Sequence, residues 1–335
     1  MATIFSEGIF ARFEEQFRPF LAKLEIPESA LTRRDVEISS RKFAELLETV
    51  AWNTNPYIGL DMGQSLVPGD IGVIGHAMSA TSSIGEALAV FSRYLYVLSH
   101  SNTIRLDVGE DKVVCTYTVT ILQPDLVRQD AEFALSWITT MIRKLSGRNF
   151  RPRFIEFSHS QFKSTKRHQS LFDCDIAFEQ RNNRIHFSKK VLDYPVLTAD
   201  PSLLEALIFY LDSRLCLRSE EDDLLAKVRH LISISLGDGL PDMNRIASLL
   251  GMSGRTLQRK LRDEKVAFAD LVDEIRYAIA QDYISHSEFS LTDVSMMLGY
   301  GELSSFSRAF KRWTGSSPDL VRKSLSTNQD EPGKQ

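Results

Sequence analysis

The chain has 335 residues, of which 43% are hydrophobic and 25% are charged, and its formal net charge is −4. These values are typical of globular domains and exclude a fibrous chain, and the length allows two domains that each have a core. The cysteines Cys115, Cys174 and Cys216 lie far apart, which argues against a disulfide framework and against a C-x-x-C metal site. We therefore expect a reducing, cytoplasmic setting, no metal and no cofactor. Because the net charge is acidic, any surface for nucleic acid must be local.

The N-terminal stretch contains Glu7, Glu14 and Glu15, which interrupt its apolar residues. A signal peptide needs an unbroken apolar segment after a basic one, so this pattern argues against a signal peptide. No apolar run approaches the ~18 residues that cross a bilayer. We therefore expect no membrane association.

The first part of the chain mixes helical and strand patterns. Apolar residues at helical spacing predict helices over residues 10–24, 40–52, 81–99 and 130–147. In the third of these, Ser82 or Ser83 is placed as the N-cap, with Glu86 as its partner. Gly147 is placed to end the fourth. Alternating patterns predict strands on both sides of a turn at residues 109–111, and over residues 152–159, 174–180 and 183–188.

These patterns divide the chain into two domains and a tail. Residues 1–216 are expected to form an α+β domain, in which helices accompany a small antiparallel sheet. The pattern is helical throughout from Asp200, and we place the domain boundary at residues 216–223. Residues 222–323 are expected to form an all-α domain. Residues 324–335 are polar and lack a core face, so we expect a disordered tail.

Residues 242–264 have the pattern of a helix, a tight turn and a second helix. Gly251 falls where the chain must reverse, a position that often needs a positive φ. Ser253 is placed to cap the second helix. Leu257 and Leu261 are four residues apart and face inward. The opposite face of this helix carries an outward stripe of polar and basic residues: Arg255, Gln258, Arg259 and Arg262.

Residues 291–313 repeat this scheme, which makes a chance match much less credible. Gly299 takes the place of the turn glycine, and Phe306 and Phe310 face inward from the second helix. The outer face of that helix carries Ser304, Arg308 and Lys311. Residues 268–285 read as one long helix that links the two copies, with Phe268, Leu271, Ile275 and Ala278 on its inner side.

Two helix-turn-helix units on one connector suit double-stranded DNA. A recognition helix fits the major groove, and two joined units can enter successive groove segments about 34 Å apart. Arginine can read guanine and glutamine can read adenine, while other cations neutralise phosphate. A basic stripe alone would more often be a solvated surface, so the repeat carries the interpretation.

Residues 222–323 resemble the DNA-binding domain of the AraC/XylS family of bacterial transcription regulators. The segments that carry the resemblance are LGMSGRTLQRKLRDE, IRYAIAQDYI and DVSMMLGYGELSSFSRAFKRWTGSSPDLVR. The resemblance implies that Arg255, Gln258 and Arg259 face bases in the first unit. It implies the same for Leu303, Ser304 and Arg308 in the second unit, where apolar Leu303 could at best touch a thymine methyl. It also implies contact with RNA polymerase, as an activator or a repressor.

Residues 20–205 resemble the arabinose-binding-type sensor domain found in one branch of the same family. The segments are GLDMGQSLVPGDIGVIGHAMSATSSIGEALAVFSRYLYVLS, LSGRNFRPRFIEFSH, LFDCDIAFEQRNNRIHFSKKVLDYPVL and ADPSLL. The resemblance implies effector sensing, homodimerisation, or both. It does not identify a sugar as the effector.

Two other classes of protein compete with this interpretation. An enzyme is disfavoured because the sequence lacks the nucleophile-elbow, Walker, dinucleotide and zinc-protease motifs. Cys174, which lies between Asp173 and Asp175, would be a poor thiolate. A DNA-repair methyltransferase joined to this kind of module needs a cysteine-ligated zinc, which three dispersed cysteines do not supply.

The other competing class is a regulator whose first domain binds a protein partner and no small molecule. The Gly-rich segment that contains Gly72, Gly75, His76 and Met78 could line a pocket or form a buried turn with a satisfied histidine. A change in DNA affinity on addition of a ligand would separate these alternatives.

Overall fold

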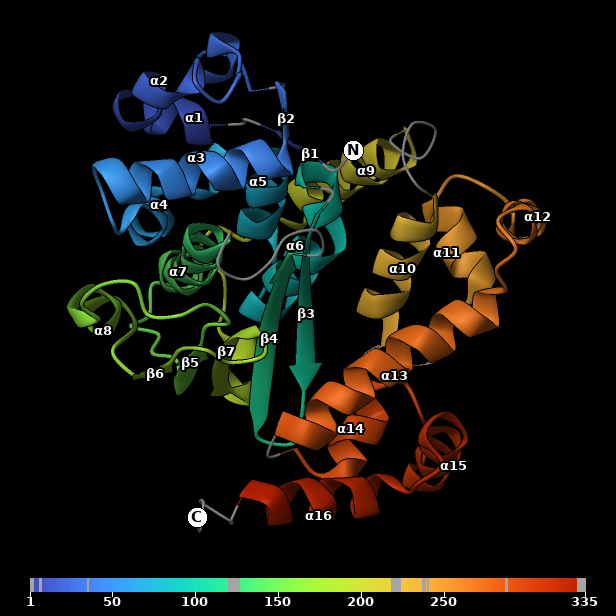
Figure 1. Cartoon of the computed structure of the whole chain (residues 1–335). Helices are drawn as coiled ribbons and strands as arrows, with labels where there is room; N and C mark the ends of the chain where they lie inside the picture. Colours follow the sequence, from blue (N-terminus) through green and yellow to red (C-terminus); the bar gives the residue numbers. More distant parts are fainter. Residues whose placement is uncertain are drawn as a thin grey trace. The chain divides into compact units, whose positions relative to one another are not determined.

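The computed structural model describes residues 3–5, 8–34, 36–99, 101–119, 127–217, 224–236, 239, 241–286 and 289–329. The chain divides into two compact units (Figure 1). The first comprises Met1–Leu106 and Asp111–Asp222, and the second comprises Asp107–Glu110 and Asp223–Gln335. Most of the expected boundary segment, residues 218–223, lies outside the described residues. Within the described residues, no helix is long and apolar enough to cross a membrane.

The first unit is rich in helices. Its α-helices are α1 Ile9–Arg12, α2 Glu14–Leu21, α3 Ser40–Asn53, α4 Ile58–Ser65, α5 Val73–Ala80, α6 Ile84–Leu98, α7 Arg128–Ser146, α8 Lys166–Phe172 and α9 Pro201–Leu217. Short 3-10 helices add η1 Glu28–Leu31, η2 Pro68–Ile71 and η4 Lys189–Asp193. The capping predictions are confirmed, because the Ser83 side chain accepts from the Glu86 amide and Gly147 ends α7 with a φ of 65°.

The single helix expected over residues 10–24 was wrong, because the chain forms α1 and α2 with a break at Phe13. Phe13 has a φ of −113° and a ψ of 25°, outside the helical region. The break turns Phe10 so that its ring packs on both Phe17 and Phe43, with centroids 5.2 and 5.9 Å away. Aromatic packing therefore outweighs the continuous helix that the spacing favours.

A five-stranded sheet in the order β3-β4-β7-β5-β6 completes the first unit (Figure 1). Its strands are β3 Asn102–Val108, β4 Lys112–Val119, β5 Phe154–Glu156, β6 Asp175–Ala177 and β7 Asn183–Ser188, and β1 Thr3–Phe5 pairs separately with β2 Glu37–Ser39. Cys115 of β4 and Ile155 of β5 both lie opposite Ile185 of β7, and all three are buried. The expectation of an antiparallel sheet fails at one pair. β5 and β6 run parallel, because the segment between them contains α8 and returns the chain to the end of the sheet at which β5 began.

The second unit is helical in its described residues, apart from the short segment Asp107–Glu110. Its helices are α10 Leu224–Ser235, α11 Met243–Leu249, α12 Gly254–Asp263, α13 Phe268–His286, α14 Leu291–Met297, α15 Leu303–Thr314 and α16 Pro318–Gln329. The fold class expected from the sequence is confirmed: a mixed α/β region precedes an all-helical domain. Residues 324–329 were expected in a disordered tail but continue α16, and residues 330–335 lie outside the described residues.

The linking helix α13 buries only part of the face that was expected to point inward. Leu271 is buried as expected, but Phe268 and Ile275 are only partly covered and Ala278 is exposed. Ile279 and Tyr283 are buried instead. This difference brings Arg276 into the interior, where it is 6% exposed. Its Nε donates to the Leu298 carbonyl at 2.8 Å, and its guanidinium lies 4.3 Å from the centroid of the Tyr300 ring. A hydrogen-bonded cation therefore occupies a position that an apolar pattern cannot reveal.

Candidate nucleic-acid interface

The first helix-turn-helix unit consists of α11, a turn at Gly251 and α12. Gly251 has a φ of 66°, which favours glycine, and the Ser253 side chain accepts from the Thr256 amide at 3.1 Å. Leu257 and Leu261 are buried. The local predictions for this unit are therefore confirmed, and they fix the rotation of α12 about its axis. That rotation leaves the four predicted residues exposed: Arg255, Gln258, Arg259 and Arg262.

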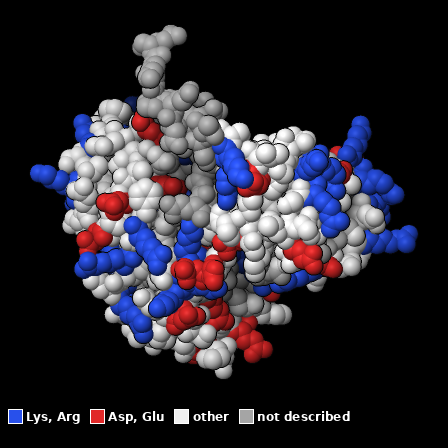
Figure 2. Space-filling model, turned by 90° about the horizontal axis from the view of Figure 1, so that it is seen from below, with Lys and Arg blue, Asp and Glu red and all other residues white. Residues whose placement is uncertain are grey.

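The cations of α12 are not engaged by the protein itself. Within the described part of the chain, the side chains of Arg255, Arg259, Lys260 and Arg262 form no hydrogen bond and no ion pair. A guanidinium that is held by no internal partner can donate to a base edge or a phosphate without first breaking a contact. In Figure 2, Lys and Arg side chains gather at the right-hand edge, the side on which Figure 1 has α12 and α15.

The four predicted residues of α12 line one open groove. It has a volume of about 1070 Å³, and it is also lined by residues 265–270, which form the turn before α13 and its first residues. The structure adds three polar residues that the sequence interpretation missed, Thr256, Lys265 and the acidic Asp270. Lys265 follows the helix with a φ of 60°, so its place beside the groove depends on a turn that helical periodicity does not describe.

The second helix-turn-helix unit consists of α14, a turn at Gly299 and α15. Gly299 has a φ of 75°, and a Cβ at this position would lie 2.2 Å from the Gly239 carbonyl oxygen, so the turn requires glycine. Phe306 and Phe310 are buried, as predicted. Burial raises the pKa of Tyr300, which packs on Phe306, although the charge of Arg276 opposes the rise.

The outward face of α15 differs chemically from that of α12. Leu303, Ser304, Arg308 and Lys311 are all exposed, as predicted. Arg308 donates to the Ser304 carbonyl and the Ser305 hydroxyl at 3.4 and 3.5 Å, so its guanidinium lies along its own helix. The Ser304 hydroxyl donates to Glu302 at 3.1 Å, which places a carboxylate beside this face. The two recognition helices therefore present unequal surfaces.

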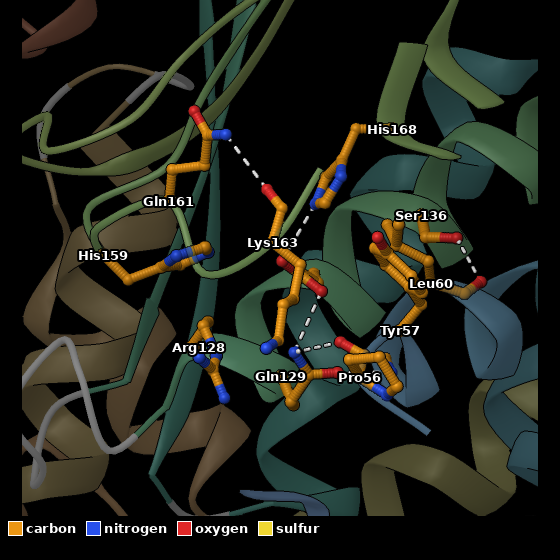
Figure 3. Close-up of polar contacts among 12 residues, drawn as sticks. Pro56, Tyr57, Leu60, Arg128, Gln129, Ser136, His159, Gln161, Lys163 and His168 are labelled. Carbon is orange, nitrogen blue, oxygen red and sulfur yellow. Dashed lines mark hydrogen bonds and ion pairs between the residues drawn. The ribbon is translucent and has the colours of Figure 1, made fainter. Parts of the chain in front are cut away.

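The first unit contains a buried polar cluster around α7 (Figure 3). His168 Nε2 lies 2.9 Å from Glu132 Oε1, and the Gln129 side chain donates to Glu132 Oε2 at 3.1 Å. His159 is 1% exposed, and burial lowers its pKa, which favours the neutral imidazole. Both histidines were expected to be surface or structural residues, and both are buried.

Two further sequence candidates have no catalytic geometry. Burial, with the charges of Asp175 and Asp173, raises the pKa of Cys174 to about 11, so this cysteine is a poor nucleophile at neutral pH. In the Gly-rich segment, a Cβ at Gly75 would lie 1.8 Å from the Pro68 carbonyl oxygen, which shows close packing. His76 is exposed, so neither the pocket nor the satisfied buried histidine describes it.

A helical domain with two helix-turn-helix units and a recognition helix that carries unpaired cations defines a DNA-binding transcription regulator. Residues 16–196 match the arabinose-binding domain of AraC transcription regulators, and residues 246–324 match a helix-turn-helix domain. The chain belongs to the AraC family of transcription regulators. Members of this family are not enzymes, which removes the enzyme alternative.

Relatives match both units of the chain. The HTH-type transcriptional regulator VirS of Mycobacterium tuberculosis is 26% identical over 307 residues, which cover 91% of this chain and 90% of VirS. The ornithine utilization regulator of Pseudomonas aeruginosa is 24% identical over 269 residues, 80% of this chain and 78% of that protein. The crystal structure of the transcriptional regulator CdpR from Pseudomonas aeruginosa covers 92% of this chain and 97% of its own, at 21% identity and a TM-score of 0.46.

Proposed function

We propose that this protein is a dimeric, sequence-specific regulator in which α12 reads the DNA sequence and α15 adds affinity. The observation that carries the proposal is the contrast between the two helices. Arg255 and Arg259 of α12 are exposed and have no partner among the described residues, whereas Arg308 of α15 is held along its own helix. A free guanidinium can form the paired hydrogen bonds that identify a guanine.

In the first helix-turn-helix unit, Arg255, Gln258 and Arg259 contact base edges in the major groove, and Arg262 extends the same stripe. Arginine suits guanine and glutamine suits adenine, so this helix discriminates between base pairs. In the second helix-turn-helix unit, Arg308 and Lys311 neutralise phosphate, while Leu303 and Ser304 add at most weak base contacts. Phosphate contacts fix orientation and carry no direct sequence information.

We assign dimerisation to the outer face of α9. Leu203, Phe209 and Tyr210 are 47%, 80% and 46% exposed, an unusual concentration of large apolar groups on one helix. Two copies of α9 that cross antiparallel about a two-fold axis would cover these side chains with the same side chains of the partner, which is the arrangement of an isologous interface.

The first unit then modulates DNA binding through this dimer, in response to a small-molecule effector. The family membership supports this proposal, and it also supports contact between the bound regulator and RNA polymerase. A dimer places two DNA-binding units on repeated sites, so any change in the relation of its subunits alters the sites that it can occupy together.

The test of DNA recognition is selection of bound fragments from the host genome by the full-length protein at near-physiological salt, where non-specific binding is weak. We expect a recovered motif with repeated half-sites a whole number of helical turns apart. If the folded protein enriches no motif with or without cell metabolites, sequence-specific reading by α12 is refuted. If a protein extract is required in place of metabolites, the first unit senses a protein partner.

The test of the dimer is sedimentation of Phe209→Glu beside Leu320→Glu. Leu320 lies on α16 and is 63% exposed, so both variants place a charge on an exposed apolar position. We expect Phe209→Glu to be monomeric and Leu320→Glu to keep the mass of the wild type. Equal masses for the two variants would exclude α9 as the interface.

A further inference from the structure

A small cavity lies inside the first unit, between α6 and α7. Its volume is about 40 Å³. One wall is formed by Phe91, Leu95 and Leu98 of α6, which are spaced so that they share one face of that helix. The opposite wall is formed by α7, where Asp130 and Trp137 lie at the two ends of the contact. These two positions are seven residues apart, or about 10 Å along the helix.

The two ends of this cavity have different chemistry. At one end the Phe91 and Trp137 rings pack with centroids 4.6 Å apart. At the other end a chain of hydrogen bonds leads to Asp130: Asn102 Nδ2 donates to the Tyr117 hydroxyl at 2.6 Å, and that hydroxyl donates to Asp130 Oδ2 at 2.7 Å. The cavity is therefore an apolar slot with a single anionic end.

Asp130 differs from two neighbouring carboxylates, the partly buried Glu48 of α3 and the buried Glu132 of α7. Glu48 pairs with Arg128, and Glu132 pairs with the imidazole of His168 at 2.9 Å. Asp130 is 5% exposed and, within the described part of the chain, has no ion pair with a basic group. Burial raises its pKa to about 6, and the Tyr117 hydrogen bond offsets only part of that rise. A buried carboxylate without a cation is costly, and a positively charged ligand would remove that cost.

Trp137 gives an independent indication that the cavity takes a ligand. The Trp137 side chain is buried and lines the cavity, yet its Nε1 has no hydrogen-bond partner among the described residues. Buried indole N–H groups usually find an acceptor. The face of an aromatic ring is a weak acceptor for such a group.

We propose that this cavity is the effector site and that it binds a small primary amine carried on a single aromatic ring. The ammonium group would donate to Asp130, and the ring would lie between the apolar residues of α6 and the indole of Trp137. The 10 Å between the two ends suits a ring joined to the amine by a short chain. A free carboxylate on the ligand would meet Asp130 or the apolar wall, so the site excludes acids.

The ligand must widen the slot, since an apolar cavity that holds benzene has a volume of about 150 Å³. Widening moves α6 against α7. The same helix carries Arg93 and Tyr94, which contact Asp212 of α9 at 2.9 and 2.7 Å. Movement of α6 therefore reaches the helix to which we assign dimerisation, and this step rests on the function proposed above.

The test is titration calorimetry of the full-length protein with four probes of one shape: 2-phenylethylamine, 2-phenylethanol, ethylbenzene and 3-phenylpropionate. We expect the amine to bind with a millimolar or tighter Kd, about tenfold tighter than the alcohol, since hydrogen bonds to charged groups are the stronger kind. We expect weaker binding of the hydrocarbon and none of the acid. An acid that binds as well as the amine, or an amine that does not bind at millimolar concentration, overturns the proposal.

Two variants locate the binding. Asp130→Asn should abolish the tenfold preference for the amine over the alcohol, and a thermal melt of the same sample shows whether it is folded. Ala134→Leu should fill the slot and abolish binding of all the probes while the protein stays folded. An unchanged amine preference in folded Asp130→Asn contradicts the assignment.

A parallel measurement of DNA affinity with and without the amine separates the two proposals. If the amine binds through Asp130 but leaves DNA affinity unchanged, the site stands and the proposed modulation fails. If the protein selects its DNA motif but binds no amine, the regulator stands and this site fails.

Discussion

Tyr94 of α6 donates a hydrogen bond from its hydroxyl to Asp212 Oδ1 of α9 at 2.7 Å, across 118 positions of sequence. Burial, together with this hydrogen bond, raises the pKa of Tyr94, so the hydroxyl remains a donor at physiological pH. Arg93 approaches the same oxygen at 2.9 Å. A single carboxylate thus joins the helix that lines the internal cavity to the helix with the exposed apolar face.

We expect Tyr94→Phe to lower the free energy of unfolding by about 1–2 kcal/mol, because it removes a buried donor from a charged acceptor. Arg93→Met should cost about 0.5 kcal/mol or less, since that ion pair is more than a third exposed and screened by solvent. Urea unfolding of the two variants measures both values. Equal costs would mean that the ion pair contributes as much as the hydroxyl and would contradict this ranking.

Arg259→Ala should weaken binding to the best DNA site by about 1–3 kcal/mol and relax the preference at one base pair. Lys260→Ala is the matched control, because it removes an exposed cation from the same helix but from another face. Binding to a panel of single-base variants of the selected site gives both quantities. A uniform loss over the whole panel would identify Arg259 as a phosphate contact.

Arg308→Ala should weaken binding to all sequences by a similar factor and reduce the slope of log affinity against log salt by about 1. The control is Arg312→Ala, since Arg312 on the same helix is engaged with Asp273 at 2.5 Å. Titrations at several salt concentrations give the slopes. A base-specific loss in Arg308→Ala would show that the second helix-turn-helix unit also reads sequence.

Phe306→Ala should lower the free energy of unfolding by about 3–5 kcal/mol, because it empties an aromatic position that is 0% exposed. Leu320→Ala, at a largely exposed position on α16, should cost little. Calorimetric melting of the full chain shows the change in the transition of the second unit. An unchanged melting temperature for Phe306→Ala would contradict the core of this helix-turn-helix.

Asp130 predicts a pH dependence of stability. Its pKa is about 6 in the folded chain and 3.8 as the ordinary value, so between these values the folded state binds the proton more tightly. This group therefore adds stability as the pH falls, by about 1 kcal/mol from pH 7 to pH 5. Asp130→Asn should lose that gain when unfolding is compared with the wild type at both pH values. Parallel pH profiles for the two proteins would show that Asp130 does not titrate in this range.

The sequence predicted those features that depend on local spacing. The rotation of α12 follows from Leu257 and Leu261, which must be buried, and the turns follow from Gly251 and Gly299. The cap at Ser83 likewise needs only residues within one turn. For such features, the pattern of apolar residues and the chemistry of caps and turns are sufficient.

Features that depend on distant partners could not be predicted in this way. The inner face of α13 differs from the apolar pattern because Arg276 donates to the Leu298 carbonyl and lies over the Tyr300 ring, and both residues come later in the chain. The polar end of the cavity joins Tyr117 of a strand to Asp130 of a helix. Nothing in the local sequence distinguishes Asp130 from the other acids of the first turn of a helix, so its isolation appears only in the fold.

The buried contact of Arg276 with Leu298 and Tyr300 restricts the spacing of the contacts along the DNA target. Because α13 is fixed to the second helix-turn-helix unit by this contact, α12 and α15 cannot move apart to follow a longer site. One added base pair would displace the second contact by about 3.4 Å and rotate it by roughly 34° around the duplex. If both helices contact one half-site, as proposed above, the protein fixes the spacer within that half-site, and the distance between half-sites depends on how the two subunits of the proposed dimer are joined. Related operators should share the spacer within a half-site and differ in the distance between half-sites.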